Sequence, residues 1–541
     1  MKKSIFLLSL ALLTSCKTVQ NSQKQPFVWE GANLYFLLTD RFKNGDTSND
    51  VNFGRTEKAA VLRGFEGGDL RGVIQKIDDG YFTDLGVNAI WMTPLVEQIH
   101  GATNEGTGNT YGFHGYWAKD WTELDPNFGT KAELKELVEK AHKKGIRVVL
   151  DAVINHTGPV TAQDAVYPNS WVRTSPQCKY SNYESMTACT LVANLPDILT
   201  ECNAPAELPQ MLVDKWKKEG KYEAEMKSLD EFFARTGYPR APKYYIMKWL
   251  ADYVQEYGID GYRVDTVKHT NEDVWKDFQK VCQQAFDIYK RENPGKVLDN
   301  NPFFTVGEVY GYGISQKQNY DFGDKKVNYY QNGFKSLINF DFKGDANKSY
   351  EEIFSNYSKL LHSDLNGKTV MNYSASHDDG WPYDKERKKS YENATKLLLT
   401  PGISQIYYGD ESARSLIIAG TEGDATLRSN MNWNDIANKP ETQKLLQYWQ
   451  KLGKFRANHP AVGAGVHVMI SQSPYWFSRT YNNDKVVIGL DLPSGTKSVN
   501  VDGIFNEGDK IRDAYSGATM PVIKGQVSLT NNNSVVLLEK Y

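Results

Sequence analysis

The chain has 541 residues, with 63 basic and 66 acidic side chains and a formal net charge of −3. This length exceeds what one ordinary hydrophobic core supports, so two to four domains are expected. The near balance of charge gives no electrostatic case for nucleic acid as a partner. The chain is rich in Trp, Tyr and Phe, which serve both core packing and ligand contacts, so composition alone does not choose between the two.

The first residues have the pattern of an export signal. Met1-Lys2-Lys3 precedes a short apolar run, Ser4 to Leu13, which is too short to span a bilayer. We predict a signal peptide over residues 1–15. Leu13-Thr14-Ser15-Cys16 resembles a bacterial lipobox, which implies a lipidated Cys16 and a tether over residues 16–26. An ordinary signal peptide with an incidental cysteine is the alternative.

This N-terminal segment predicts a lipoprotein whose lipid anchors it to the outer membrane of a Gram-negative bacterium. We expect the protein to be a monomer. Residues 17–20 lack an acidic run, which favours the periplasmic face over the cell surface. Export permits disulfides. Cys178 and Cys189 close a short loop and are the first candidates, whereas Cys202 and Cys282 can pair or stay reduced.

Short apolar strands alternate with helical patterns from residue 34 onward. Helices are expected at Lys131–Lys144 and Tyr244–Tyr257. The strand candidates are Leu34–Leu38, Val87–Met92, Ile146–Asp151, Ile259–Asp265, Phe304–Glu308, Leu337–Phe340, Thr369–Tyr373 and Ser404–Tyr408. Eight such units predict an α/β fold with a closed (β/α)8 barrel, over residues 27–156 and 243–459.

Two further units are expected besides the barrel. The gap between the third and fourth strands is too long for a loop, so we predict a subdomain inserted at residues 157–242, with a helical segment near Val213–Arg235. Residues 460–541 change to short alternating strands, which predict a C-terminal antiparallel β-sandwich. The strands are expected at Val466–Ile470, Tyr475–Tyr481, Lys485–Leu490, Val527–Leu529 and Ser534–Leu538.

Three carboxylates stand at or just beyond the ends of predicted barrel strands. Asp265 ends the fourth strand, Glu308 ends the fifth, and Asp378 follows the seventh. Because active sites of such barrels lie at the carboxyl ends of the strands, these groups are expected to converge on one pocket. Arg263 lies two residues before Asp265, on the same side of the strand, and would keep that carboxylate ionised.

A converging set of carboxylates suits glycoside hydrolysis, in which one carboxylate attacks the anomeric carbon and a second protonates the leaving oxygen. Asp265, beside Arg263, is the better nucleophile. Glu308 has no Arg in its own motif, so it is the better acid. A structural Arg–Asp ion pair with no chemistry is the alternative for Arg263 and Asp265.

The same positions resemble the α-amylase family of retaining glycoside hydrolases, over almost everything after the tether. The motifs that carry the resemblance are Leu37–Phe42, Phe113–Trp117, Asp151–His156, Gly261–His269, Gly307-Glu308, Ser376-His377-Asp378 and Gly402–Glu411. One departure is Ser376, where Asn is commoner in the family. A segment of the insert, residues 207–242, resembles periplasmic-type bacterial amylases.

The resemblance implies a role for each matching residue. Asp265 would be the nucleophile, Glu308 the acid/base, and Asp378 the group that binds sugar hydroxyls and stabilises the transition state. Tyr116 would stack on the attacked sugar, and Lys268 and His269 would face the leaving group. His156, Arg263 and His377 would line the subsite of the attacked sugar, with His114 nearby. For the histidines, core packing or capping is the alternative.

The resemblance also implies calcium, a hard cation that prefers oxygen ligands. The family's shared site would use Asn155, Asp197 and the backbone carbonyl of His269. A second candidate loop resembles one in cyclodextrin-forming members, with a solvated turn as its alternative. Its residues are Asn44, Asp46, Asn49, Asp50, Gly67 and Asp69.

Three functions remain open at this point. The first is endo-acting, retaining hydrolysis of α-1,4 bonds in starch, glycogen or maltooligosaccharides. The second is glucan transfer or cyclisation, or cyclodextrin degradation, by the same chemistry. The third is a non-catalytic glycan-binding lipoprotein, against which the presence of all three carboxylates argues.

Overall fold

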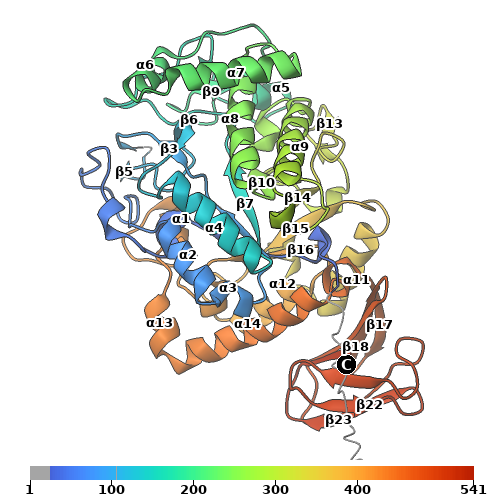
Figure 1. Ribbon diagram of the computed structural model, residues 1–541. Helices are drawn as coiled ribbons and strands as arrows, with labels where there is room; N and C mark the ends of the chain where they lie inside the picture. Colours follow the sequence, from blue (N-terminus) through green and yellow to red (C-terminus); the bar gives the residue numbers. More distant parts are fainter. Residues whose placement is uncertain (1–24, 105) are drawn as a thin grey trace, which may run out of the picture.

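A computed structural model describes residues 25–104 and 106–541. The predicted signal peptide and most of the tether, with Cys16, lie outside the described residues. Eight parallel strands close into a barrel (Figure 1), which confirms the predicted (β/α)8 architecture. The strands are β1 (Asn33–Leu37), β2 (Ala89–Met92), β7 (Arg147–Ala152), β10 (Gly261–Val264), β11 (Phe304–Gly307), β14 (Ser336–Asn339), β15 (Thr369–Tyr373) and β16 (Ile403–Tyr407).

Helices cover the outside of the barrel, as expected for a parallel sheet buried on both faces. They are α2 (Leu70–Asp78), α4 (Lys131–Lys143), α8 (Pro242–Tyr257), α9 (Val274–Glu292), α11 (Tyr350–Leu361), α12 (Ser390–Leu399) and α14 (Pro440–Asn458). α4 begins with a capping box of Thr130 and Glu133 and buries the predicted apolar face. Between β11 and β14 the described chain has no α-helix; a short hairpin of β12 (Tyr320–Asp321) and β13 (Lys326–Val327) lies there instead.

The inserted subdomain follows β7, the third barrel strand, as predicted. It contains β8 (Val172–Arg173), α5 (Glu184–Thr187), β9 (Asp197–Ile198), α6 (Gln210–Lys218) and α7 (Tyr222–Thr236). The single helical segment predicted near Val213–Arg235 is two helices, because Gly220 adopts a left-handed φ of 70° that ends the first. Cys178 and Cys189 form the predicted disulfide, while Cys202 and Cys282 are free thiols.

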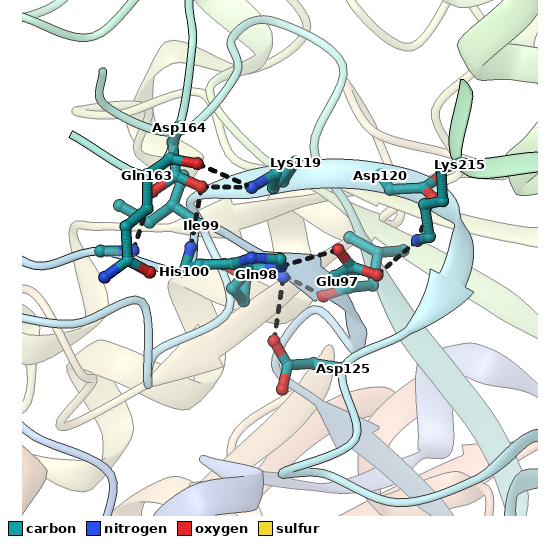
Figure 2. Close-up of polar contacts among 12 residues, drawn as sticks. Glu97, Gln98, Ile99, His100, Lys119, Asp120, Asp125, Gln163, Asp164 and Lys215 are labelled. Atoms are coloured by element: carbon teal, nitrogen blue, oxygen red, sulfur yellow. Dashed lines mark hydrogen bonds and ion pairs between the residues drawn. The ribbon is translucent and has the colours of Figure 1, made fainter. Parts of the chain in front are cut away.

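A polar network ties the insert to the barrel (Figure 2). Lys215 of α6 pairs with Glu97 at 2.5 Å and with Asp120 at 2.6 Å. These carboxylates lie on the antiparallel pair β3 (Val96–Gln98) and β6 (Ala118–Leu124), which leaves the barrel between β2 and β7. The Gln98 side chain accepts a hydrogen bond from the Trp117 backbone N–H at 2.7 Å. The network therefore also orients the segment that carries His114 and Tyr116.

The C-terminal residues form two antiparallel sheets around a separate core, which confirms the predicted sandwich. Figure 1 shows this unit beside the barrel, next to α11. One sheet has six strands: β17 (Val466–Gln472), β18 (Tyr475–Tyr481), β19 (Asp484–Leu490), β24 (Val536–Lys540), β21 (Lys510–Asp513) and β22 (Thr519–Pro521). The other pairs β20 (Gly495–Asn500) with β23 (Gln526–Asn531). No helix among residues 25–104 and 106–541 is long and apolar enough to cross a membrane.

Candidate active site

The Arg263 guanidinium joins three carboxylates at the carboxyl end of the barrel. Its Nη1 lies 2.7 Å from Asp265 Oδ1 and 3.1 Å from Asp151 Oδ1, and its Nη2 lies 2.9 Å from Glu308 Oε2. The register explains the meeting, because Arg263 on β10 stands opposite Asp151 on β7, and Glu308 follows β11 on the other side. All four side chains are buried.

Glu308 has no Arg in its own motif, but Arg263 on the neighbouring strand contacts it as well as Asp265. The two residues are far apart in sequence, so the motif of Glu308 alone could not reveal the pair. Burial nevertheless raises the pKa of Glu308 to about 8, against the opposing charge of Arg263. Asp265 and Asp378 add to the rise through like charge. A carboxyl group protonated near neutral pH suits a general acid.

The backbone after Asp265 turns sharply towards Glu308. Thr266 has a φ of 47°, a left-handed conformation that costs about 1–3 kcal/mol for residues other than glycine. In this conformation its N–H donates to Glu308 Oε2 at 3.0 Å. The strained turn therefore helps to fix the position of the candidate acid relative to Asp265.

Asp378 lies on the loop after β15, with its side chain 35% exposed. Its Oδ1 accepts a hydrogen bond from Ser376 Oγ at 2.9 Å, and His377 Nε2 lies 3.8 Å from Oδ2. Partial burial opposes ionisation of Asp378, but His377 and Arg263 together lower its pKa below the ordinary value. Ser376 thus supplies a hydrogen bond where the family has a commoner Asn. The carboxylate lines one cavity with Glu308 and Arg263.

Tyr116 and three histidines lie around this carboxylate group. The ring of Tyr116 stacks on His377 with centroids 5.2 Å apart, and its hydroxyl donates to Asp151 Oδ2 at 2.8 Å. His156 Nε2 is 3.1 Å from the Tyr116 carbonyl, and His114 Nδ1 accepts the Tyr116 N–H at 3.1 Å. Burial lowers the pKa of each histidine, so all three are neutral near pH 7.

Lys268 and His269 lie in the short 3-10 turn that follows β10 and Asp265. Lys268 Nζ donates to the Tyr310 carbonyl at 3.0 Å and lies 5.3 Å from the centroid of the Tyr310 ring. His269 Nδ1 is 3.0 Å from the carbonyl of Met186 in the insert. The structure therefore gathers the predicted substrate-binding residues around one group of carboxylates.

Sequence reasoning did not identify three residues of this site, namely Asp151, Trp91 and Arg428. Asp151 contacts Arg263, Tyr116 and also Trp91, whose Nε1 donates to it at 3.1 Å. Its position at a strand end, opening the Asp151–His156 motif, was the signal that could have identified it. Arg428 donates to the His377 carbonyl at 2.8 Å from a distant segment, and nothing in its own sequence neighbourhood indicates this contact.

The residues predicted for the shared calcium site offer oxygen ligands, but only one of them, Asp197, is a carboxylate. Asp197 Oδ1 is buried with no hydrogen-bond partner in the described chain, while Oδ2 pairs with Arg173 at 2.8 Å. Asn155 Oδ1 accepts the Thr270 hydroxyl at 3.1 Å. The described residues hold no group of three or more His, Cys, Asp or Glu side chains placed for a metal. The predicted set instead combines one carboxylate with amide and carbonyl oxygens, which suit calcium.

The second candidate loop also offers oxygens that lack partners. Asn44 Oδ1 and Asn49 Oδ1 are buried without a hydrogen bond within the described residues. A Cβ at Gly67 would lie 2.6 Å from Asp50 Oδ1, so only glycine fits this cradle. Two of the predicted ligands are engaged elsewhere: Asp69 caps α2, and Asp46 accepts from Ser48. Asp50 Oδ1 accepts from Asn44 Nδ2 at 2.8 Å, which leaves the side-chain oxygens of Asn44 and Asn49 without partners among the described residues.

Comparisons with known proteins agree with this geometry. Residues 36–453 match the family described as Alpha amylase, catalytic domain. The periplasmic α-amylase of Escherichia coli is 35% identical over 524 residues, which cover 86% of this chain and 72% of that protein. A cyclomaltodextrin glucanotransferase of Geobacillus stearothermophilus is 26% identical, covering 93% of this chain and 65% of its own length.

A solved structure shares the fold. The α-amylase of Geobacillus thermoleovorans, in complex with acarbose, superposes with a TM-score of 0.64 at 21% identity, over 95% of this chain and all of that one. The family match extends over more than half of the chain and includes all eight carboxyl ends of the barrel strands. The chain therefore belongs to the α-amylase family of glycoside hydrolases.

Proposed function

We propose that this enzyme hydrolyses internal α-1,4-glucosidic bonds of starch, glycogen or maltooligosaccharides with retention of configuration. The single observation that carries the proposal is the shared guanidinium of Arg263, whose two terminal nitrogens contact Asp265 at 2.7 Å and Glu308 at 2.9 Å. One guanidinium between two carboxyls supports the short separation of retaining enzymes, about 5–5.5 Å. The acarbose bound to the similar Geobacillus thermoleovorans α-amylase supports a maltooligosaccharide ligand.

The mechanism follows from the environments of the carboxyls. Asp265 attacks the anomeric carbon, while Glu308 gives its proton to the leaving glycosidic oxygen. Glu308 then takes a proton from water, which attacks the same carbon and releases Asp265. Asp378 accepts hydrogen bonds from sugar hydroxyls and stabilises the positive charge of the oxocarbenium-like transition state. His114, His156 and His377 are neutral and line the subsite of the attacked sugar without adding positive charge.

Product analysis on maltoheptaose tests this function. We expect shorter maltooligosaccharides, released first as the α-anomer in proton NMR spectra, and loss of at least about 10³-fold in kcat for Glu308→Gln. Release of the β-anomer, or equal rates for wild type and Glu308→Gln, would contradict the proposal.

Glucan transfer or cyclisation is the second candidate, favoured by the similarity to the cyclomaltodextrin glucanotransferase over 93% of this chain. In that reaction a sugar hydroxyl replaces water as acceptor for the same covalent intermediate. Rings, or products longer than the maltoheptaose supplied, would identify transfer as the main activity. Their absence would support hydrolysis.

We further propose that calcium binds between barrel and insert through Asn155, Asp197 and the His269 carbonyl, with a second ion at Asn44, Asn49 and Asp50. The orphaned oxygens of Asp197, Asn44 and Asn49 support this assignment. When bound, calcium would neutralise the Asp197 carboxylate and hold the insert on the barrel. EDTA should lower the melting temperature through ligand linkage, and Asp197→Asn should reduce that shift. An identical melting curve with EDTA would contradict the proposal.

We also propose that the enzyme is an exported lipoprotein of the outer membrane, facing the periplasm. The lipobox-like Leu13–Cys16 supports this location. Mass spectrometry of the N-terminal peptide should find a lipid on Cys16, and Cys16→Ser should release the enzyme from the membrane fraction. An unlipidated N-terminus in the wild type would refute the anchor. Protease treatment of intact cells distinguishes the periplasmic face from the surface.

A further inference from the structure

Trp381 is the most exposed large hydrophobic side chain among the described residues, with 83% of its surface accessible. It lies on the loop after β15, three residues beyond Asp378. An aromatic side chain buries roughly 150–250 Å² when covered, so this exposed indole, close to Asp378 in the chain, offers a large contact area to a ligand.

The backbone that carries Trp381 is held in place. Asp379 is buried, and its carboxylate accepts the Tyr373 hydroxyl at 2.6 Å and the Trp381 N–H at 3.1 Å. Lys343, which follows β14, completes an ion pair with the same carboxylate. These contacts of Asp379 hold the main chain of the loop, while the indole of Trp381 stays exposed to solvent. A side chain held in this way is preorganised to contact a ligand.

Trp381 borders a cavity of about 630 Å³, within the range of roughly 300–1,000 Å³ typical of ligand sites. Its lining combines aromatic faces with charged groups and includes Phe340, Lys343, Asp345, Pro382 and Tyr383. Phe340 also lines the cavity that holds Glu308 and Asp378. Phe340 therefore borders both the cavity of the carboxylates and the cavity beside Trp381.

The contacts favour the leaving-group side of the cleft. Lys268, assigned to that side, donates to the Tyr310 carbonyl. The Tyr310 ring, half exposed, lies 5.0 Å from the ring of Phe340. Contacts therefore connect Lys268 to Tyr310, Tyr310 to Phe340, and Phe340 to the cavity beside Trp381.

We propose that Trp381 is a stacking platform for a glucose ring in the leaving-group part of a bound α-glucan, and that it makes the enzyme prefer longer chains. The proposal rests on the α-glucan hydrolysis proposed above. The C–H face of a glucose ring packs against the indole, and hydroxyls at the ring edge meet Lys343 and Asp345. Such a contact lies beyond the sugars next to the cleaved bond, so short substrates cannot use it.

Kinetics on substrates of two lengths test this role. Trp381→Ala should raise KM for maltoheptaose about five- to tenfold and leave KM for maltotriose within about twofold. Trp381→Phe, which keeps a ring, should recover most of the loss. Tyr541→Ala, which removes an exposed ring of the C-terminal sheet, is the matched control and should change neither value. Equal effects of Trp381→Ala on both substrates would refute the proposal.

The cleavage pattern tests the side of the cleft. On maltoheptaose labelled at its reducing end, loss of a leaving-group subsite removes binding modes that place many sugars beyond the cut. Trp381→Ala should therefore release shorter labelled fragments than the wild type. A shift to longer labelled fragments, or an unchanged pattern, would overturn the assignment.

A binding measurement separates failure of this proposal from failure of the proposed hydrolysis. Calorimetric titration with maltoheptaose, in the Glu308→Gln background, should give weaker binding when Trp381→Ala is added, without any turnover. If the wild type hydrolysed no α-glucan but this difference persisted, the platform would stand and the activity would fall. If hydrolysis occurred and the two affinities were equal, the platform would fall alone.

Discussion

At the residue scale, Asp151 joins three other side chains of the site. It holds Arg263 on one side and the Tyr116 hydroxyl and Trp91 Nε1 on the other. Its charge competes with Glu308 for the Arg263 guanidinium. Asp151 is therefore a positioning residue for both the candidate acid and the stacking tyrosine.

We expect Asp151→Asn to lower kcat about 10²-fold, because small misplacement of reacting groups costs rate of this order. Arg263 would then interact more strongly with Glu308 and lower its pKa, so the basic limb of the pH–rate profile should move to lower pH. Trp91→Phe removes the hydrogen bond to Asp151 but no charge, so it should leave the basic limb of the pH–rate profile in place. An unmoved limb in Asp151→Asn would reduce Asp151 to a structural role.

The raised pKa of Glu308 predicts the pH dependence of the wild type. The acid must be protonated to act, and its pKa is about 8. Activity should therefore be retained on the acidic side of this value and fall as pH rises through about 8. The measurement is kcat/KM on maltoheptaose between pH 5 and pH 10, and a profile still flat at pH 9.5 would contradict the burial argument.

At the element scale, ion pairs of Lys215 attach α6 of the insert to strands β3 and β6. Its two partners, Glu97 and Asp120, are buried, whereas the Lys215 side chain is 24% exposed (Figure 2). Removal of the lysine would leave two carboxylates buried side by side. Such a loss costs about 3–5 kcal/mol for a fully buried pair, and partial exposure of Lys215 reduces it.

Lys215→Met should therefore destabilise the protein by about 1–3 kcal/mol and open the insert to proteases. Lys218→Met, at an exposed position of the same helix, is the control. Thermal unfolding and limited proteolysis measure the two effects. If both variants behaved alike, the network would not hold the insert.

The elements themselves were predicted to different extents. All eight barrel strands were located because each is a short, largely apolar run that is buried on both faces. The sequence did not reveal β20, β21 and β22, which are short, largely polar and stabilised by pairing across long separations. The break between α6 and α7 depended on one glycine conformation that periodicity does not detect.

At the scale of the whole molecule, His459 joins the barrel to the C-terminal sandwich. It follows α14, and its ring nitrogens contact Asp484 of β19 at 2.7 Å and Glu539 of β24 at 2.5 Å. Burial opposes protonation, but hydrogen bonds to these two carboxylates raise the pKa of His459 to about 9. The imidazolium therefore links two strands of the sandwich to the last barrel helix.

Because the folded pKa exceeds the unfolded value of about 6.5, this link contributes fully below pH 6.5 and is lost as pH rises through about 9. The shift corresponds to about 3 kcal/mol. Melting temperature should fall across this window in the wild type, and His459→Gln should be less stable at pH 6 but flatter with pH. Parallel wild-type and variant curves would exclude the link.

The sequence by itself determined the barrel, the insert, the sandwich and the identity of the three carboxylates, because strand ends and local motifs record them in adjacent residues. It offered Cys178 and Cys189 as the first candidates for a disulfide, and the structure forms that bond. Only the tertiary structure decided that Arg263 serves Glu308 as well as Asp265, that Asp151 organises the site, and that Trp381 borders a second cavity. These contacts join residues on different strands and loops, and their geometry depends on barrel register and burial, which no local pattern encodes.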